Sequence, residues 1–153
     1  MKLLTYPNPL LQTRSQEINL VDFDVKKLRK LARKMIKLMN KHKGIGLAAP
    51  QAGESLRMCV INSKAGCLLK DLILINPIII ERSMEKNIKK EGCLSLPKVQ
   101  IDVERPMWIK IKTIDFEGRS FNLETGDLLA RVIQHEIDHL DGMLIIDHIT
   151  YNI

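Results

Sequence analysis

The stretch QHEIDHLDG, residues 134–142, places two histidines four positions apart with a glutamate between them. These residues are His135, Glu136 and His139. On an α-helix, positions i and i+4 lie one above the other, so both imidazoles can bind one metal ion. Glu136 would then reach a water on that metal. The alternative is a surface helix with two incidental histidines, because the H-E-x-x-H pattern is short.

The sequence around this motif is apolar on two sides of the same helix. One stripe carries both histidines with Leu128 and Val132, and a second carries Ile133, Ile137 and Leu140. A helix that is apolar on two sides is buried, and one cation can satisfy two buried histidines. With Thr125 or Asp127 as the N-cap and Gly142 as the C′ residue, the helix is expected to span about residues 126–141.

A site of this kind needs a third protein ligand. One zinc-peptidase pattern requires a histidine at position 145, which is Ile145, and another requires a later glutamate, which the sequence lacks. Asp141 and Asp147 lie too near the helix end, and His148 is a weaker candidate. The third ligand is therefore expected upstream, where the best donor is Cys93 in EGCLSLP, residues 91–97.

Composition favours one globular domain. The 153-residue chain is 45% hydrophobic and 27% charged, and no apolar run approaches the roughly 20 residues of a membrane span. The N-terminus shows no secretory pattern. The three cysteines do not form a disulfide framework and suit a reducing compartment; Cys59 and Cys67 match no motif and are interpreted as packing or incidental residues. We expect one catalytic domain over residues 1–153, in the cytoplasm and away from membranes.

The net charge of +6 permits contact with nucleic acid. The basic residues are mostly spread along residues 26–43, where the solvated face of a helix explains them, and only 4% of the chain is aromatic. We therefore expect no sequence-specific nucleic-acid binding.

The hydrophobic pattern predicts an α+β fold. An amphipathic N-terminal helix follows Asp22 or Asp24, and its apolar positions are Val25, Leu28, Leu31, Met35, Leu38 and Met39. Strands are expected at 58–61, 72–80 with a bend at Asn76-Pro77, 84–90 with weak pairing, 107–114 and 120–124. These mostly antiparallel strands would pack around the buried metal-binding helix.

The segment GIGLAAPQ, residues 44–51, is neither a P-loop nor a dinucleotide fingerprint. Its two glycines allow close backbone approach to another group. Small apolar residues lead directly to Gln51, whose buried amide could orient a carbonyl or an oxyanion.

Together and in this order, the segments 44–51, 91–97 and 134–142 resemble the three motifs of the peptide deformylases. The resemblance implies that Cys93, His135 and His139 hold a catalytic divalent metal. It also implies that Glu136 is the general base and acid. The Gln51 side chain and the Leu94 backbone N–H would bind the oxygen that becomes negative.

The resemblance also implies how a peptide binds. Ile45, Gly46 and Gly92 correspond to backbone that pairs with an extended substrate, and Glu91 and Arg105 correspond to an ion pair near the cysteine loop. Leu128 and Val132 share the metal stripe, so they should line an apolar pocket that suits a methionine side chain. Gln100 stands where some members carry a peptide-contacting arginine, which predicts weaker peptide binding.

The implied activity is removal of the formyl group from the N-terminal formyl-methionine of newly made peptides, with release of formate. The alternatives are a metal-dependent amidase or peptidase of other specificity, and a non-catalytic metal-binding module. The implied ion is Fe²⁺ in cells, with Zn²⁺, Ni²⁺ or Co²⁺ as alternatives. The expected partners are formylated nascent peptides, with the ribosome as a further candidate. The chain is expected to lack the C-terminal extension of many family members.

Overall fold

The computed structural model describes residues 1–66 and 68–149; Cys67, which the sequence suggested as a packing or incidental residue, lies outside them. Two helices, α1 (Val25–Lys41) and α2 (Asp127–Leu140), accompany seven strands. The strands are β1 (Gly46–Ala48), β2 (Met58–Ile61), β3 (Leu72–Arg82), β4 (Lys86–Cys93), β5 (Leu96–Pro106), β6 (Trp108–Ile114) and β7 (Ser120–Gly126). Short 3-10 helices are η1 (Pro9–Gln12), η2 (Ala49–Ala52), η3 (Ser63–Ala65) and η4 (Ile145–His148).

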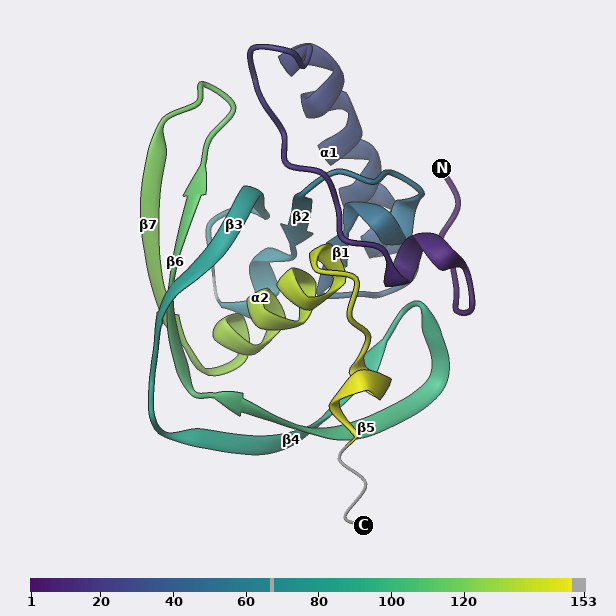
Figure 1. The fold of residues 1–153 in the computed structure, drawn as a ribbon, viewed down its shortest axis with the longest axis vertical. Helices are drawn as coiled ribbons and strands as arrows, with labels where there is room; N and C mark the ends of the chain where they lie inside the picture. The colour runs from purple at the N-terminus through teal and green to yellow at the C-terminus, as the bar shows by residue number, and fades with distance from the viewer. Residues whose placement is uncertain (67, 150–153) are drawn as a thin grey trace.

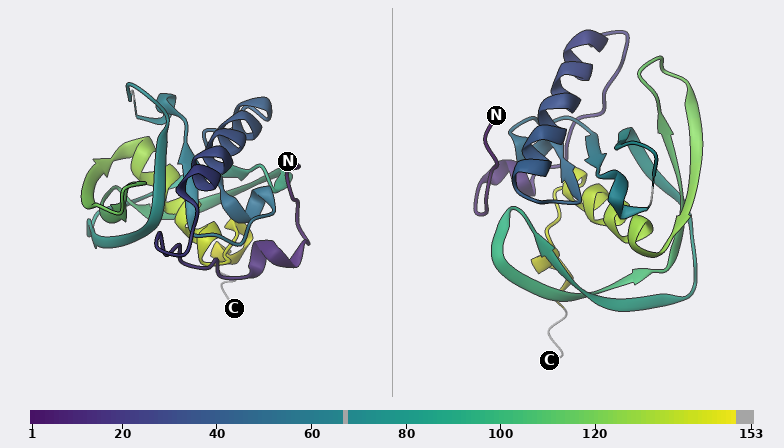
Figure 2. Two further views of the ribbon diagram at one scale, coloured as in Figure 1. Left: turned by 90° about the horizontal axis from the view of Figure 1, so that it is seen from above. Right: turned by 180° about the vertical axis from the view of Figure 1, so that it is seen from behind.

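Within the described residues, every pair of strands is antiparallel, which confirms the predicted α+β fold of mostly antiparallel strands. Five strands form one sheet in the order β1-β2-β3-β6-β7, and β4 and β5 form a separate two-stranded ribbon. Figure 1 shows α2 at the centre, with β6 and β7 on one side and the curved β4–β5 ribbon beneath it. The view from behind in Figure 2 shows the same enclosure, with α1 packed beside β1 and β2.

The two faces of the sheet carry different helices. In β2, Cys59 and Ile61 pack with the core around α2, whereas Met58 and Val60 pack with the core around α1. This alternation follows from the two-residue period of a strand, which sends successive side chains to opposite faces. A third, smaller core lies under the ribbon and consists of Leu11, Cys93, Leu96, Val103, Leu144 and Ile145.

The ends of the helices have clear physical causes. Asp24 caps α1, since its carboxylate accepts hydrogen bonds from the N–H groups of Lys26 at 2.8 Å and Lys27 at 3.4 Å. After α2, Gly142 has a φ of +78°, the left-handed value expected of a C′ residue.

The expected N-cap of α2 was wrong. Neither Thr125 nor Asp127 caps the helix; Gly126 occupies that position and supplies no side-chain cap. The reason is that β7 continues to Gly126, the residue immediately before the helix, with Thr125 still opposite Ile109 in the ladder. Asp127 then turns the chain with a φ of +51°.

Two strands were not predicted from the sequence, namely β1 and β5. Residues 84–90 were expected to pair weakly, but β4 pairs with β5 from Lys86 to Cys93, with one register shift between Gly92 and Cys93. Cys93 therefore lies at the end of β4, next to α2.

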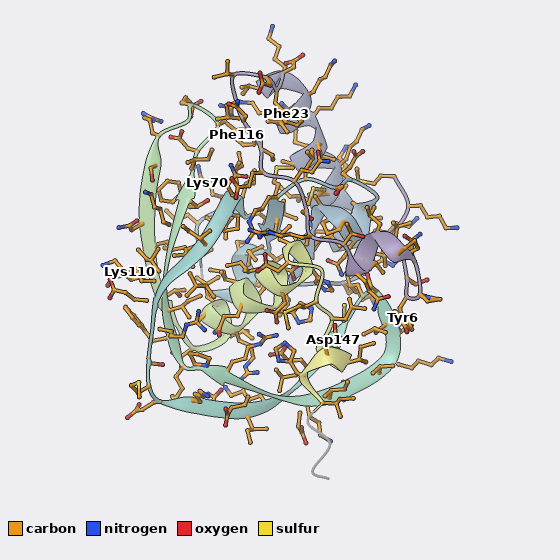
Figure 3. All side chains as sticks on the ribbon, viewed as in Figure 1. Tyr6, Phe23, Lys70, Lys110, Phe116 and Asp147 are labelled. Carbon is orange, nitrogen blue, oxygen red and sulfur yellow. The ribbon has the colours of Figure 1, made fainter. Side chains whose placement is uncertain are left out.

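An exposed ion-pair cluster joins strands β3, β6 and β7. Lys110, labelled at the left of Figure 3, lies between Glu81 at 3.4 Å and Glu124 at 2.9 Å.

Among the described residues, neither helix is long and apolar enough to cross a membrane.

Asn76 holds the bend in β3 that the sequence indicated. Its φ is +49°, and the register with β6 shifts between Ile75 and Ile78. The side-chain oxygen of Asn76 accepts from the Ile18 N–H at 2.9 Å, and its amide donates to the Ile18 carbonyl at 2.8 Å. The amide thereby attaches the N-terminal segment to the sheet.

We predict that Asn76→Ala lowers the free energy of unfolding by about 2–3 kcal/mol, because it removes two hydrogen bonds and forces alanine into the left-handed region. Asn76→Gly is the matched control: it loses the same bonds but tolerates the backbone, so it should be about 1 kcal/mol more stable than the alanine variant. Urea unfolding followed by circular dichroism measures both. Equal stability of the two variants would contradict the backbone contribution.

Candidate metal centre

Three side chains with metal-binding atoms meet between the ribbon and α2. The ligand atoms of Cys93, His135 and His139 all lie within 4.8 Å of one another. The Cys93 sulfur is 3.1 Å from Nε2 of His139, and the two imidazole rings are 4.9 Å apart at 80° to each other. The helix supplies both rings at i and i+4, and the end of β4 supplies the sulfur.

This donor set fits a divalent metal ion. Bonds of about 2.0–2.3 Å in a tetrahedral site hold ligand atoms about 3–4 Å apart, and the 3.1 Å between the Cys93 sulfur and Nε2 of His139 lies in that range. Cys93 and His139 are buried, and Nδ1 of His139 and Oε2 of Glu136 have no hydrogen-bond partner within the described part of the chain. Three protein ligands leave a fourth position open, as in catalytic rather than structural sites.

His148, the weaker candidate from the sequence, lies outside this group. Its Nε2 is 2.8 Å from Oδ2 of Asp138. Arg105 donates to the same carboxylate oxygen at 2.9 Å. Asp138 and His148 therefore belong to a polar network behind the centre.

The carboxylate of Glu91 connects the ribbon to the metal-binding helix. Arg105 donates to both of its oxygens, at 2.6 and 2.9 Å, and Arg131 donates at 2.6 Å. Nδ1 of His135 lies 3.0 Å from Glu91, which leaves Nε2 of that ring for a metal. Burial alone would raise the pKa of Glu91, but hydrogen bonds from His135 and Arg105 hold it well below its ordinary value.

The sequence reasoning did not find Arg131. This arginine is buried in α2 and also donates to the Val103 carbonyl at 3.0 Å. Its position four residues before His135 was the available signal, because i and i+4 side chains share a helix face. A buried arginine requires a partner for its charge, which here is the carboxylate of Glu91.

Gln51 reaches the centre from η2. Its side-chain oxygen accepts from the Ala48 N–H at 2.8 Å, so its amide nitrogen faces the sulfur of Cys93 at 3.6 Å. The same nitrogen donates to Ser95 at 3.1 Å, and Ser95 donates to the Leu4 carbonyl at 2.8 Å. The N-terminal segment thus braces both the glutamine and the loop after Cys93.

Glu136 projects into the same space from α2. Burial raises its pKa to about 7, although the positive charges of His135 and Arg105 act in the opposite direction. The carboxyl group contacts the backbone of Gly46 so closely that a Cβ there would lie 2.2 Å from Oε1. The glycine is therefore required for the position of this carboxyl group.

A cleft of about 590 Å³ opens on the centre and brings together most of the residues that the sequence singled out. Those lining it are Ile45, Gly46, Gln51, Gly92, Cys93, Leu94, Leu128, Val132, His135 and Glu136. His139 lies behind them and is 1% exposed. Leu128 is 47% exposed, so it stands at the mouth of the cleft while Val132 lies deeper.

One edge of the cleft is a strand with free backbone groups. The Ile45 carbonyl accepts from the Asn62 N–H at 2.9 Å, on the β2 side. Successive residues of an antiparallel strand direct their polar groups to opposite sides, so those of Gly46 and Ala48 face away from β2. The Ala48 N–H meets Gln51, and the Gly46 N–H and carbonyl face the cleft.

The chain matches a family model described as polypeptide deformylase over residues 1–152. A protein of Borreliella burgdorferi named peptide deformylase is 45% identical over 148 residues, which is 97% of this chain and 87% of that protein. One of Dictyoglomus thermophilum with the same name is 46% identical over 140 residues, 92% of this chain and 86% of that protein.

Solved structures agree with these relatives. The crystal structure of peptide deformylase from Thermotoga maritima superposes with a TM-score of 0.89 at 37% identity. The match covers 98% of this chain and 97% of that one.

Replacing Cys93 tests the metal centre. We predict that Cys93→Ala loses tight metal binding, because it removes the single thiolate of the donor set. Cys59→Ala is the matched control, since Cys59 is also buried but packs in the core beneath α2. Elemental analysis after anaerobic purification should find metal in the wild type and the control and essentially none in Cys93→Ala. A full equivalent in Cys93→Ala would exclude this cysteine as a ligand.

Proposed function

Because the chain belongs to the peptide deformylase family, we propose that Cys93, His135 and His139 hold its catalytic ion while Glu136 moves the protons of the reaction. The protein is a metal-dependent hydrolase that removes the formyl group from the N-terminal formyl-methionine of newly made peptides and releases formate. The observation that supports these roles best is the convergence of the three ligand atoms within 4.8 Å beside a buried carboxyl group.

The proposed ion in cells is Fe²⁺, as the family resemblance implies; two imidazoles and a thiolate also suit Zn²⁺, Ni²⁺ or Co²⁺. When bound, such an ion acts as a Lewis acid and brings the pKa of a coordinated water to about 7. Glu91 holds the His135 ring by its Nδ1, so the geometry of the donor set does not depend on the ion alone.

Glu136 is the proton carrier in this proposal. Its carboxyl group accepts the proton of the attacking water and delivers it to the departing amine nitrogen. The absence of a protein partner for Oε2 among the described residues supports this role, because that oxygen is free to bind water. The contact with Gly46 keeps the group close to the centre.

The oxygen of the formyl group becomes negative as water adds to the carbon. The Gln51 amide, 3.6 Å from the Cys93 sulfur, is suited to donate to it. The N–H of Leu94, the residue after Cys93 at the start of the ribbon turn, is the second proposed donor. Each such donor contributes about 2.7–4 kcal/mol to transition-state stabilisation in comparable sites.

The peptide is proposed to bind as an added strand. The outward-facing N–H and carbonyl of Gly46 would pair with the substrate backbone, with Ile45 beside them and Gly92 on the opposite wall of the cleft. The methionine side chain would enter between Leu128 and Val132, which are apolar and line the same cleft. This arrangement puts the formyl group at the metal and the rest of the peptide at the mouth.

We also propose that residues 1–153 act as one catalytic domain in the cytoplasm, on peptides at or released from the ribosome. A thiolate ligand supports a reducing compartment, because oxidation of the sulfur would destroy the donor set. The substrate is produced where translation begins, which supports the same location.

Glu136→Gln should keep its metal but lose about 10²–10⁴-fold in turnover, because glutamine cannot carry the proton. A formate-release assay on formyl-Met-Ala, with elemental analysis of the same anaerobic sample, measures both. Acetyl-Met-Ala is the control substrate, followed by the free α-amino group that its hydrolysis exposes, and its turnover at a similar rate would indicate an amidase of other specificity. Wild-type turnover by the metal-loaded variant would reject Glu136 as the proton carrier.

Gly46→Ala should lower turnover by a similar factor, because the new Cβ would displace the Glu136 carboxyl group. Gly126→Ala is the matched control: its φ of −125° suits alanine, and its nearest neighbour would be the Met107 carbonyl at 3.5 Å. Steady-state kinetics on formyl-Met-Ala compares the two. Equal activity of both variants would contradict the required close approach.

A further inference from the structure

Three lysines stand at the mouth of the cleft. Lys43 follows α1, Lys90 lies in β4 and Lys98 lies in β5, so different segments bring them together. All three are exposed. The two acidic residues that line the cleft, Glu91 and Glu136, are both buried inside it. The mouth is therefore positively charged on more than one side.

The charges of these lysines are not neutralised within the described residues. Elsewhere on the surface, Lys86 pairs with Glu104 at 2.9 Å and Lys110 contacts two glutamates. Lys90 stands opposite Asp102 in the ribbon, yet the two form no ion pair within 4.0 Å. All three ammonium groups remain available to a ligand.

Two of the lysines occupy backbone positions that disfavour them. Lys43 has a φ of +56° and Lys98 a φ of +67°. Glycine or asparagine adopts this left-handed region more readily, so lysine there is a local cost. Such costs concentrate at functional positions, and here both border the same cleft.

We propose that the lysines at the mouth select formyl-methionyl peptides with acidic side chains at the second and third positions; this inference rests on the proposed function. With the formyl group at the metal, an extended peptide advances about 3.3 Å per residue, which brings those positions to the mouth. Carboxylates there meet Lys43, Lys90 and Lys98, whereas lysine or arginine side chains meet like charge. The backbone pairing at Gly46 is the same for every peptide, so the lysines supply a preference on top of it.

The expected preference is moderate and depends on salt. One exposed charge pair changes binding by about 1.5- to 5-fold, so two acidic residues against two basic ones should differ by about 10-fold in kcat/KM. The Debye length shortens from about 10 Å at 0.1 M to about 3 Å at 1 M, so high salt should abolish most of the difference.

The test compares three C-terminally amidated peptides on the metal-loaded enzyme: formyl-Met-Asp-Asp-Ala, formyl-Met-Ala-Ala-Ala and formyl-Met-Lys-Lys-Ala. The wild type should turn over the acidic peptide about 10-fold better than the basic one. A Lys43→Gly, Lys90→Gln, Lys98→Gly variant should treat all three alike while keeping its kcat/KM on the neutral peptide. Glycine suits the two left-handed positions, so the thermal midpoint of this variant should not fall. Lys112→Gln, an exposed lysine outside the cleft, should keep the preference.

Each outcome bears on a different claim. Turnover of the neutral peptide without a charge preference would overturn this inference alone, whereas no turnover of any formylated peptide would overturn the proposed function as well. A preference that persists in the triple variant would assign it to other residues and overturn the role of the lysines. Inhibition of neutral-peptide turnover by a short RNA, lost in the triple variant and unaccompanied by peptide preference, would assign the lysines to phosphate binding instead.

Discussion

A buried carboxylate, that of Glu91, ties together the parts from which the centre is built. It accepts hydrogen bonds from Nε and Nη2 of Arg105 in β5 and from Arg131 in α2, and Nδ1 of His135 in α2 lies 3.0 Å away. Removing one partner from a buried ionic cluster typically costs about 3–5 kcal/mol, because the remaining charge is left without compensation. The β4–β5 ribbon is a separate sheet, and the cluster joins it to the central helix α2. Cys93 lies only two residues after Glu91, so the same contacts position its sulfur.

Much of this centre could be predicted from the sequence, because its chemistry is local. Two histidines four residues apart define a common helix face, and the apolar stripes around them predict burial. The helix expected over about 126–141 spans Asp127–Leu140. Cys93 could be proposed because few thiols, imidazoles or carboxylates outside that helix were plausible ligands. The family resemblance added a role for the Leu94 backbone N–H that the residue pattern alone does not predict, and it agreed with the role already inferred for Gln51.

The features that were missed depend on contacts between distant segments. In β5 the inward-facing positions include Arg105, whose burial makes sense only beside Glu91, so the strand lacks a clean apolar alternation. Strand β1 has three residues and owes its existence to pairing with β2. The prediction of the α2 N-cap was wrong for a related reason, because Thr125 pairs with Ile109 in the β6–β7 ladder. Propensity and capping rules are local, and each of these outcomes is decided by tertiary pairing.

The ligands are unevenly distributed along the chain. Cys93 is made well before α2, and the N-terminal segment that braces Gln51 is made first. During synthesis, a growing copy therefore carries one of its three ligands until its last long helix has emerged. While it is still being made, such a copy lacks two of the three candidate ligands, so during that interval only completed molecules can remove a formyl group from its N-terminus.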